Sequence, residues 1–186
     1  MLGESRLNVY VLDAEISPRQ RERLQAQVQT AIRSLPRWTF SVLTNRMDEI
    51  GVSGLPLVIE PVRATGSPLP LSLGEIEGRP AARLRPTVAG ETIEWGQDPR
   101  YLVAKAVGYL AAPAAESSFW AGWAAAIEQD SLRERAGESA AAWHNETDLG
   151  LFVEMFAASA LRNGHFRWAE LPAIHAMLRE LRDEAA

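Results

Sequence analysis

The order of the secondary-structure signals is the feature that most limits what this chain can fold into. Apart from one early helix, the strand-like stretches lie within residues 7–97, and the apolar patterns within 98–186 have a helical period. Segregated strands and helices are typical of the α+β class. The 186 residues, 47% of them hydrophobic, suffice for one core. We therefore expect a single domain over residues 1–186, with a twisted mixed sheet followed by a helical half.

The sheet-rich half is predicted to begin with a strand, a helix and a second strand. Residues 7–12 are rich in β-formers and indicate the first strand. Ser17 can cap a helix whose first turn holds Pro18, and Gln20 completes a capping box. Pro36 is expected to end this helix. Alternating apolar residues then predict a half-buried strand parallel to the first, and these residues are Trp38, Phe40 and Val42.

The other strand signals of this half are short and interrupted by proline. Residues 55–62 and 82–88 carry apolar runs, but proline cannot donate to a sheet ladder, so we expect edge strands or short ones. Residues 64–80 are rich in glycine and proline and indicate a loop or an extended hairpin tip. Residues 92–95 predict one more short strand.

The helical half is predicted to contain helices separated by clear stop signals. Asp98 can cap the first helix, Pro99 suits its first turn, and Pro113 ends it. Gly164 is a natural stop for the third helix. The predicted helices cover residues 98–112, 117–127, 148–163 and about 168–183.

Composition excludes several classes of function. The net charge is -5 and the sequence pI is about 5.3, and such an acidic excess argues against nucleic-acid binding. The chain has no cysteine, which rules out disulfides, thiolate metal sites and a cysteine nucleophile. The first residues lack the apolar region of a signal peptide, and the most apolar run, 119–127, is far shorter than the roughly 20 residues that span a bilayer. We expect a cytoplasmic protein that does not bind membranes.

Residues 101–110, Tyr-Leu-Val-Ala-Lys-Ala-Val-Gly-Tyr-Leu, resemble the active-site helix of the zincin metalloproteases, whose core is His-Glu-x-x-His. Zinc catalysis needs two histidines one helical turn apart, with a glutamate beside the first as general base. In this chain Lys105 stands at the first histidine, Ala106 at the glutamate and Tyr109 at the second histidine. The resemblance therefore implies a degenerate zincin without zinc-protease activity.

A second segment, residues 148–158, resembles the helix that supplies the third ligand in the glutamate zincins. The pattern is closest to the lethal-factor-like branch, roughly Phe-Ala-Glu-x-Phe-Ala, and Glu154 falls on the ligand position between Phe152 and Phe156. The resemblance covers residues 7–163 and implies a zincin-like fold. Both segments also have a plain structural interpretation, as amphipathic helices of which the second carries a carboxylate at the edge of its apolar face.

Lys105 is the only lysine among 19 basic residues. Its ammonium reaches about as far from its Cα as a histidine-bound zinc would lie, on the order of 6 Å. It can thus supply the positive charge that a buried Glu154 needs, and Tyr109 can donate its hydroxyl to the same carboxylate. We expect these three residues to form a metal-free cluster with no catalytic residue, metal or cofactor. The histidines fit no ligand spacing and are expected at the surface or at its boundary with the core, and they are His144, His165 and His175.

These observations predict an inactive zincin-like protein that binds a peptide or protein. Zincin clefts hold extended substrates along a sheet edge, a mode that survives the loss of zinc, and residues 92–95 are a candidate edge. Tryptophans of the helical half are candidate anchors, although core positions suit Trp120 and Trp123 better than Trp143. Two alternatives stay open. One is a non-metal enzyme that uses a desolvated Lys105 with Glu154 or Tyr109. The other is a structural assembly domain.

Overall fold

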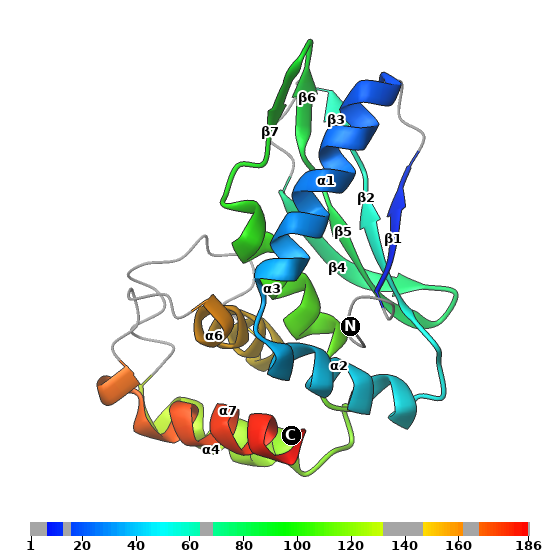
Figure 1. The fold of residues 1–186 in the computed structure, drawn as a ribbon. Helices are drawn as coiled ribbons and strands as arrows, with labels where there is room; N and C mark the ends of the chain where they lie inside the picture. The colour runs from blue at the N-terminus through cyan, green and yellow to red at the C-terminus, as the bar shows by residue number, and fades with distance from the viewer. Residues whose placement is uncertain (1–6, 13–15, 64–68, 132–146, 162–167, 186) are drawn as a thin grey trace.

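The computed structural model describes residues 7–12, 16–63, 69–131, 147–161 and 168–185. Over these residues the predicted α+β class is confirmed, with two helices and the mixed sheets built from the first half and further helices from the second (Figure 1). A hydrophobic core of buried residues extends from the first strand to the last helix, which joins both halves. Among the described residues, no helix has the combined length and apolar character needed to cross a bilayer.

The chain begins with strand β1 (Leu7–Val11) and helix α1 (Pro18–Ser34). The predicted capping box is present. The Ser17 hydroxyl accepts a hydrogen bond from the Gln20 N–H at 3.2 Å, and the Gln20 side chain accepts one from the Ser17 N–H at 2.6 Å. Two donors at the start of α1 are thereby satisfied, which fixes where the helix begins.

The strand predicted around Trp38 is wrong, because these residues belong to helix α2 (Arg37–Glu49). The buried positions of α2 recur every three or four residues, which is the helical period. Alternation over only five residues is too short to distinguish this period from that of a strand. Pro36 ends α1 as predicted, but it is also the N-cap of α2. The buried residues of α2 are Thr39, Val42, Leu43 and Met47.

The larger sheet has four strands in the order β1-β2-β5-β4, with β2 (Leu55–Ile59), β4 (Leu71–Ile76) and β5 (Arg79–Leu84). Strands β1, β2 and β5 are parallel, and β4 pairs antiparallel with β5. Strand β2 is short, as predicted, although it lies inside the sheet. The described part of 64–80 is a hairpin, and the positive φ values at its Glu77-Gly78 turn, 53° and 74°, suit a two-residue connection.

A smaller sheet consists of β3 (Val62–Arg63), β6 (Thr87–Ala89) and β7 (Thr92–Glu94), in the order β3-β6-β7. Helix α1 holds the β6–β7 hairpin through three polar side chains on one face. The Gln20 amide donates to the Gly90 carbonyl, and the Arg23 guanidinium donates to the Glu91 carbonyl at 3.1 Å. The third contact is a 3.0 Å hydrogen bond from the Trp95 indole to Gln27.

The helical half contains α3 (Pro99–Leu110), α4 (Phe119–Gln129), α6 (Asp148–Leu161), the 3-10 turn η2 (Trp168–Glu170) and α7 (Pro172–Glu184). These helices match the predicted ones, while Gly164 lies outside the described residues. Asp130, after α4, accepts the Ile174 N–H at 2.8 Å and caps α7 from a distance of 44 residues.

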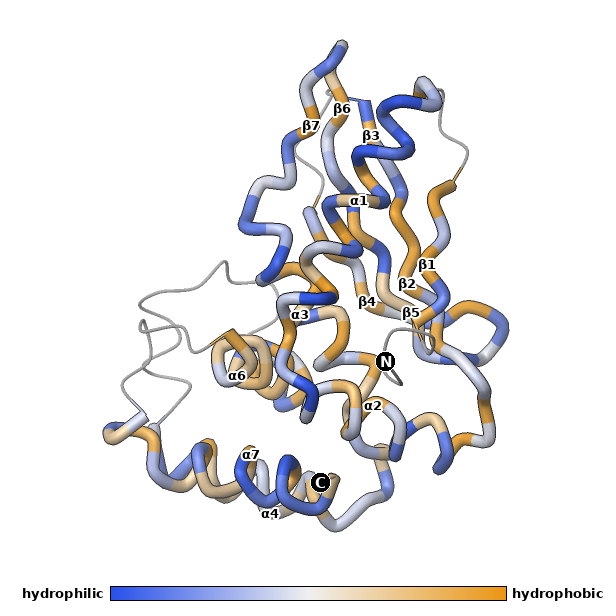
Figure 2. Tube along the Cα trace, in the orientation of Figure 1, coloured by the Kyte–Doolittle hydropathy of each residue, from blue (hydrophilic) through white to orange (hydrophobic). Residues whose placement is uncertain are grey.

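Helices α1 and α3 cover one face of the larger sheet, and α3 lies between that sheet and α6 (Figure 1). Hydrophobic residues are concentrated along β1 and β2 and in α6 (Figure 2). Because side chains alternate along a strand, the residues that point away from α1 and α3 form a second, more polar face of the sheet. That face includes Asn8, Tyr10, Ser72, Gly74 and Arg83.

Candidate functional site

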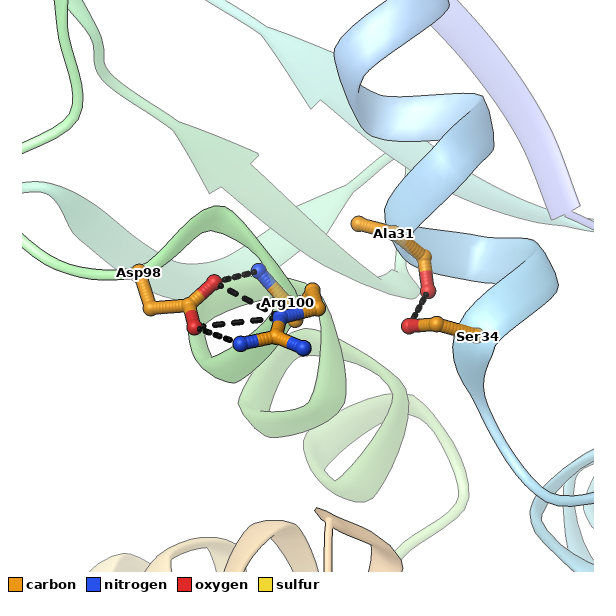
Figure 3. Close-up of polar contacts among 4 residues, drawn as sticks. All are labelled: Ala31, Ser34, Asp98 and Arg100. Atoms are coloured by element: carbon orange, nitrogen blue, oxygen red, sulfur yellow. Dashed lines mark hydrogen bonds and ion pairs between the residues drawn. The ribbon is translucent and has the colours of Figure 1, made fainter.

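The start of α3 is fixed by its predicted cap. The Asp98 carboxylate accepts the Arg100 N–H at 2.9 Å, and the Arg100 guanidinium returns to the same carboxylate at 2.7 Å (Figure 3). On the neighbouring α1, the Ser34 hydroxyl donates to the Ala31 carbonyl at 2.7 Å. The hydrogen bond from Arg100 lowers the pKa of Asp98, so the cap remains a carboxylate at neutral pH. Lys105 is thereby set in the second turn of α3.

The structure brings Lys105 and Glu154 together. The Lys105 ammonium forms a direct ion pair with Oε1 of Glu154 on α6. The two side chains are only 4% and 11% exposed, respectively. Each charge therefore compensates the other where water contributes little solvation. The first-ligand and third-ligand positions of the zincin pattern are thus joined by an ion pair.

Tyr101 completes the cluster, although sequence reasoning missed it. Its hydroxyl donates a 2.7 Å hydrogen bond to Oε2 of Glu154, and the Lys105 ammonium lies 5.0 Å from the centre of its ring. Burial raises the pKa of Tyr101, and the Glu154 carboxylate raises it further. Tyr101 is therefore a neutral donor at physiological pH, and both oxygens of Glu154 have partners.

The predicted role of Tyr109 in this cluster is wrong. Its hydroxyl donates instead to the Gly74 carbonyl of β4, at 2.9 Å. Side chains on a helix tilt toward its N-terminus, so Lys105 extends over the turn that precedes it, which contains Tyr101. Tyr109, one turn further on, is left to face β4. Burial raises the pKa of Tyr109, and the nearby carboxylate of Glu75 adds to the shift.

A close approach of α3 and α6 sets the register of the ion pair. A Cβ atom at Gly108 would lie 2.9 Å from Cδ1 of Phe156, closer than real contacts allow. Only glycine therefore lets the two helices meet at this separation. Ala106, which the resemblance aligns with the zincin glutamate, is fully buried and can contribute only packing.

The burial of the Lys105–Glu154 ion pair limits which molecules can react with it. A substrate cannot reach the Lys105 ammonium, since its side chain is buried and covered by Tyr101 and Glu154. Among the described residues, no three His, Cys, Asp or Glu side chains are grouped so as to hold a metal. His175 is exposed, and its ring lies beside that of Trp168 at an interplanar angle of 34°, whereas His144, His165 and Trp143 lie outside the described residues. Trp123 is fully buried, as predicted, and Trp120 is partly buried.

Acylation with an amine-selective reagent tests how closed the ion pair is. Lys105 is the only lysine, so it and the α-amino group are the primary amines that can react. In the folded chain at neutral pH we expect the α-amino group to react first, and Lys105 to react only after unfolding in urea. Mass spectrometry of proteolytic fragments measures both sites. Faster modification of Lys105 than of the α-amino group in the folded chain would favour the enzyme alternative.

Similarity to known proteins does not assign a function to this site. No protein-family model, curated protein or solved structure matches the chain. The zincin resemblance therefore depends on the residues of 101–110 and 148–158 and on the order of the predicted elements.

Proposed function

We propose that the chain is an inactive, zincin-like binding protein that takes up an extended peptide along the outer edge of β4. The observation that carries the proposal is the position of β4, an antiparallel strand that ends the larger sheet beside α3. Tyr109 of α3 contacts this strand through its hydrogen bond to Gly74. The buried pair of Lys105 and Glu154 supports the inactive, zincin-like part of the proposal, because it joins the two positions at which the resemblance would have metal ligands.

Within the part of the chain that the structure describes, the outer edge of β4 has backbone groups free for a further strand. The Arg85 N–H donates to the Pro70 carbonyl at 2.8 Å, which makes this a hydrogen-bonded pair of the antiparallel ladder. Hydrogen-bonded pairs recur at every second position, so the N–H and C=O of Leu73 and Glu75 point away from β5. Such groups are the template for β-strand addition, in which a peptide extends the sheet.

Strand β7, which contains most of the predicted edge at 92–95, is less suitable. It does lie at an edge, but of the smaller sheet, and it is only three residues long. Strand β4 has six residues and lies beside α3. A longer edge offers more main-chain hydrogen bonds to a peptide, which is where the affinity of strand addition originates.

Substitution of Leu73 tests the proposal. The immobilised chain is offered a displayed library of random linear peptides, and the captured peptides are titrated by fluorescence anisotropy. We expect Leu73→Pro to weaken their binding by about tenfold or more, because proline removes an outward N–H and leaves the β4–β5 ladder intact. Leu73→Ala is the matched control, since it removes the same side chain but keeps the N–H, and we expect it to retain binding.

Two results would count against this function. Equal binding by Leu73→Pro and the wild type, with both folded by circular dichroism, would show that peptides do not use the β4 edge. Failure of the wild type to capture any peptide would contradict peptide binding as such and favour the assembly-domain alternative.

A further inference from the structure

A small hollow lies beside the outer strands of the larger sheet. Its volume is about 150 Å³, and its lining residues are Ser72, Gly74, Glu75, Ala81 and Arg83. In the β4–β5 register, Ser72 lies opposite Arg83 and Gly74 lies opposite Ala81. Three of these four positions hold small residues, so the long side chain of Arg83 borders an unfilled space on the face of the sheet that points away from α1 and α3.

Positive charge on this face exceeds what the described residues compensate. Arg79, Arg83 and Arg85 alternate along β5 and its extension, and therefore share one face. Arg85 forms an ion pair with Glu60 at 2.8 Å. Among the described residues, no hydrogen bond or ion pair involves the side chain of Arg79 or Arg83. The Arg83 guanidinium is thus half-buried with no partner among the described residues, which is unusual in a chain of net charge -5 and favours an acidic ligand.

Glu75 also lines the hollow, but among the described residues no ion pair joins its carboxylate to Arg83. Residues 72 and 74 point to the open face, so alternation places the side chain of Glu75 on the opposite face, toward α3. The effect of its carboxylate on the pKa of Tyr109, a residue of α3, agrees with this placement. The hollow therefore presents the Arg83 guanidinium and the Ser72 hydroxyl, both of which can donate hydrogen bonds to a carboxylate.

A peptide strand added to β4 would place alternate side chains beside this hollow. Neighbouring strands lie about 4.8 Å apart, so the added strand would run about 10 Å from β5. An arginine and an acidic side chain can span that separation between them, provided that the strand in the middle carries small side chains. Ser72 and Gly74 meet this condition, because neither blocks the path across β4.

We infer that the hollow at Arg83 is a specificity pocket for an aspartate or glutamate side chain of an extended peptide bound at the β4 edge. This inference rests on the proposed function, since the added strand is what delivers the carboxylate. A planar guanidinium pairs with a carboxylate through two parallel hydrogen bonds, so the pocket selects an acidic residue over its amide.

The test uses the full chain and peptides captured from the random linear library. We expect these peptides to be enriched in aspartate or glutamate. Replacing that residue by asparagine or glutamine should weaken binding by about tenfold or more, because a hydrogen-bonded charge is lost. Arg83→Gln should weaken binding of the acidic peptides to a similar degree and have little further effect on the neutral ones. Arg79→Gln is the matched control, because Arg79 lies on the same face of β5 but outside the hollow.

A reversal of charge provides a readout that a merely structural role would not change. Library selection on Arg83→Glu should enrich lysine or arginine where the wild type enriches acidic residues. One outcome would refute the pocket alone. In it, Leu73→Pro abolishes peptide binding, but the affinity changes neither when Arg83 is replaced by glutamine nor when the acidic residue of the peptide is replaced by its amide. The proposed binding at the β4 edge would then still hold. If the wild type captures no peptide, both ideas fail together.

Discussion

Replacing Lys105 by methionine is expected to destabilise the folded chain by about 3–5 kcal/mol. The substitution keeps an unbranched apolar side chain but leaves the carboxylate of Glu154 buried without a counter-charge. The Lys105 and Glu154 side chains are both buried, so water cannot replace the lost partner. Urea denaturation followed by tryptophan fluorescence measures the free energy of unfolding, and the six tryptophans supply the signal.

The double variant Lys105→Met/Glu154→Leu is the decisive control. Removing both charges of a buried pair is often neutral or stabilising, so the double variant should regain most of the stability that Lys105→Met loses. Tyr101→Phe should cost less, about 1–2 kcal/mol, because it removes a hydrogen bond to the carboxylate and no counter-charge. A loss below about 1 kcal/mol for Lys105→Met would mean that water solvates Glu154, which the buried geometry does not allow.

Phe152→Ala is expected to lower the stability by a similar amount, about 3–5 kcal/mol. Phe152 is fully buried in α6, and the centre of its ring lies within 5.8 Å of four other aromatic rings. Truncation removes these contacts and leaves a cavity in the helical half. For a chain of this size the loss corresponds to a melting temperature lower by roughly 6–20 °C. The four rings belong to Phe119, Trp120, Trp123 and Phe156.

Phe119→Ala serves as the comparison for this site. Phe119 belongs to the same aromatic cluster but is only partly buried, so its truncation exposes less apolar surface and should cost clearly less. Differential scanning calorimetry of both variants measures the difference. Equal losses for the two variants would place the centre of the cluster elsewhere than at Phe152.

The elements predicted best are those whose ends carry local chemistry. Ser17 with Gln20 marks the start of α1, and Asp98 with Pro99 marks the start of α3, because a cap acts within a few residues of its helix. The segment around Trp38 lacks such a mark. Its N-cap, Pro36, makes no side-chain hydrogen bond, so a brief alternation of apolar residues was the only signal available.

The candidate site was predictable in part, for a geometric reason. Lys105 and Glu154 could be linked from the sequence because the zincin pattern aligns each of them with a metal-ligand position. Tyr101 lies outside the three replaced positions of that pattern, yet its spacing of four residues from Lys105 and the tilt of helical side chains toward the N-terminus could have identified it. The contact of Tyr109 with Gly74 could not be foreseen, because it depends on which strand closes the sheet beside α3.

The hydrogen bonds between α1 and the β6–β7 hairpin constrain the order in which parts of the protein can fold. The three hydrogen bonds, two donated by Gln20 and Arg23 and one accepted by Gln27, each join residues 68 to 70 positions apart. A chain leaving the ribosome therefore completes α1 long before its partners exist. Contacts of such long range slow folding, since the intervening segment must first be ordered. These three hydrogen bonds of α1 therefore cannot all form until residue 95 has emerged.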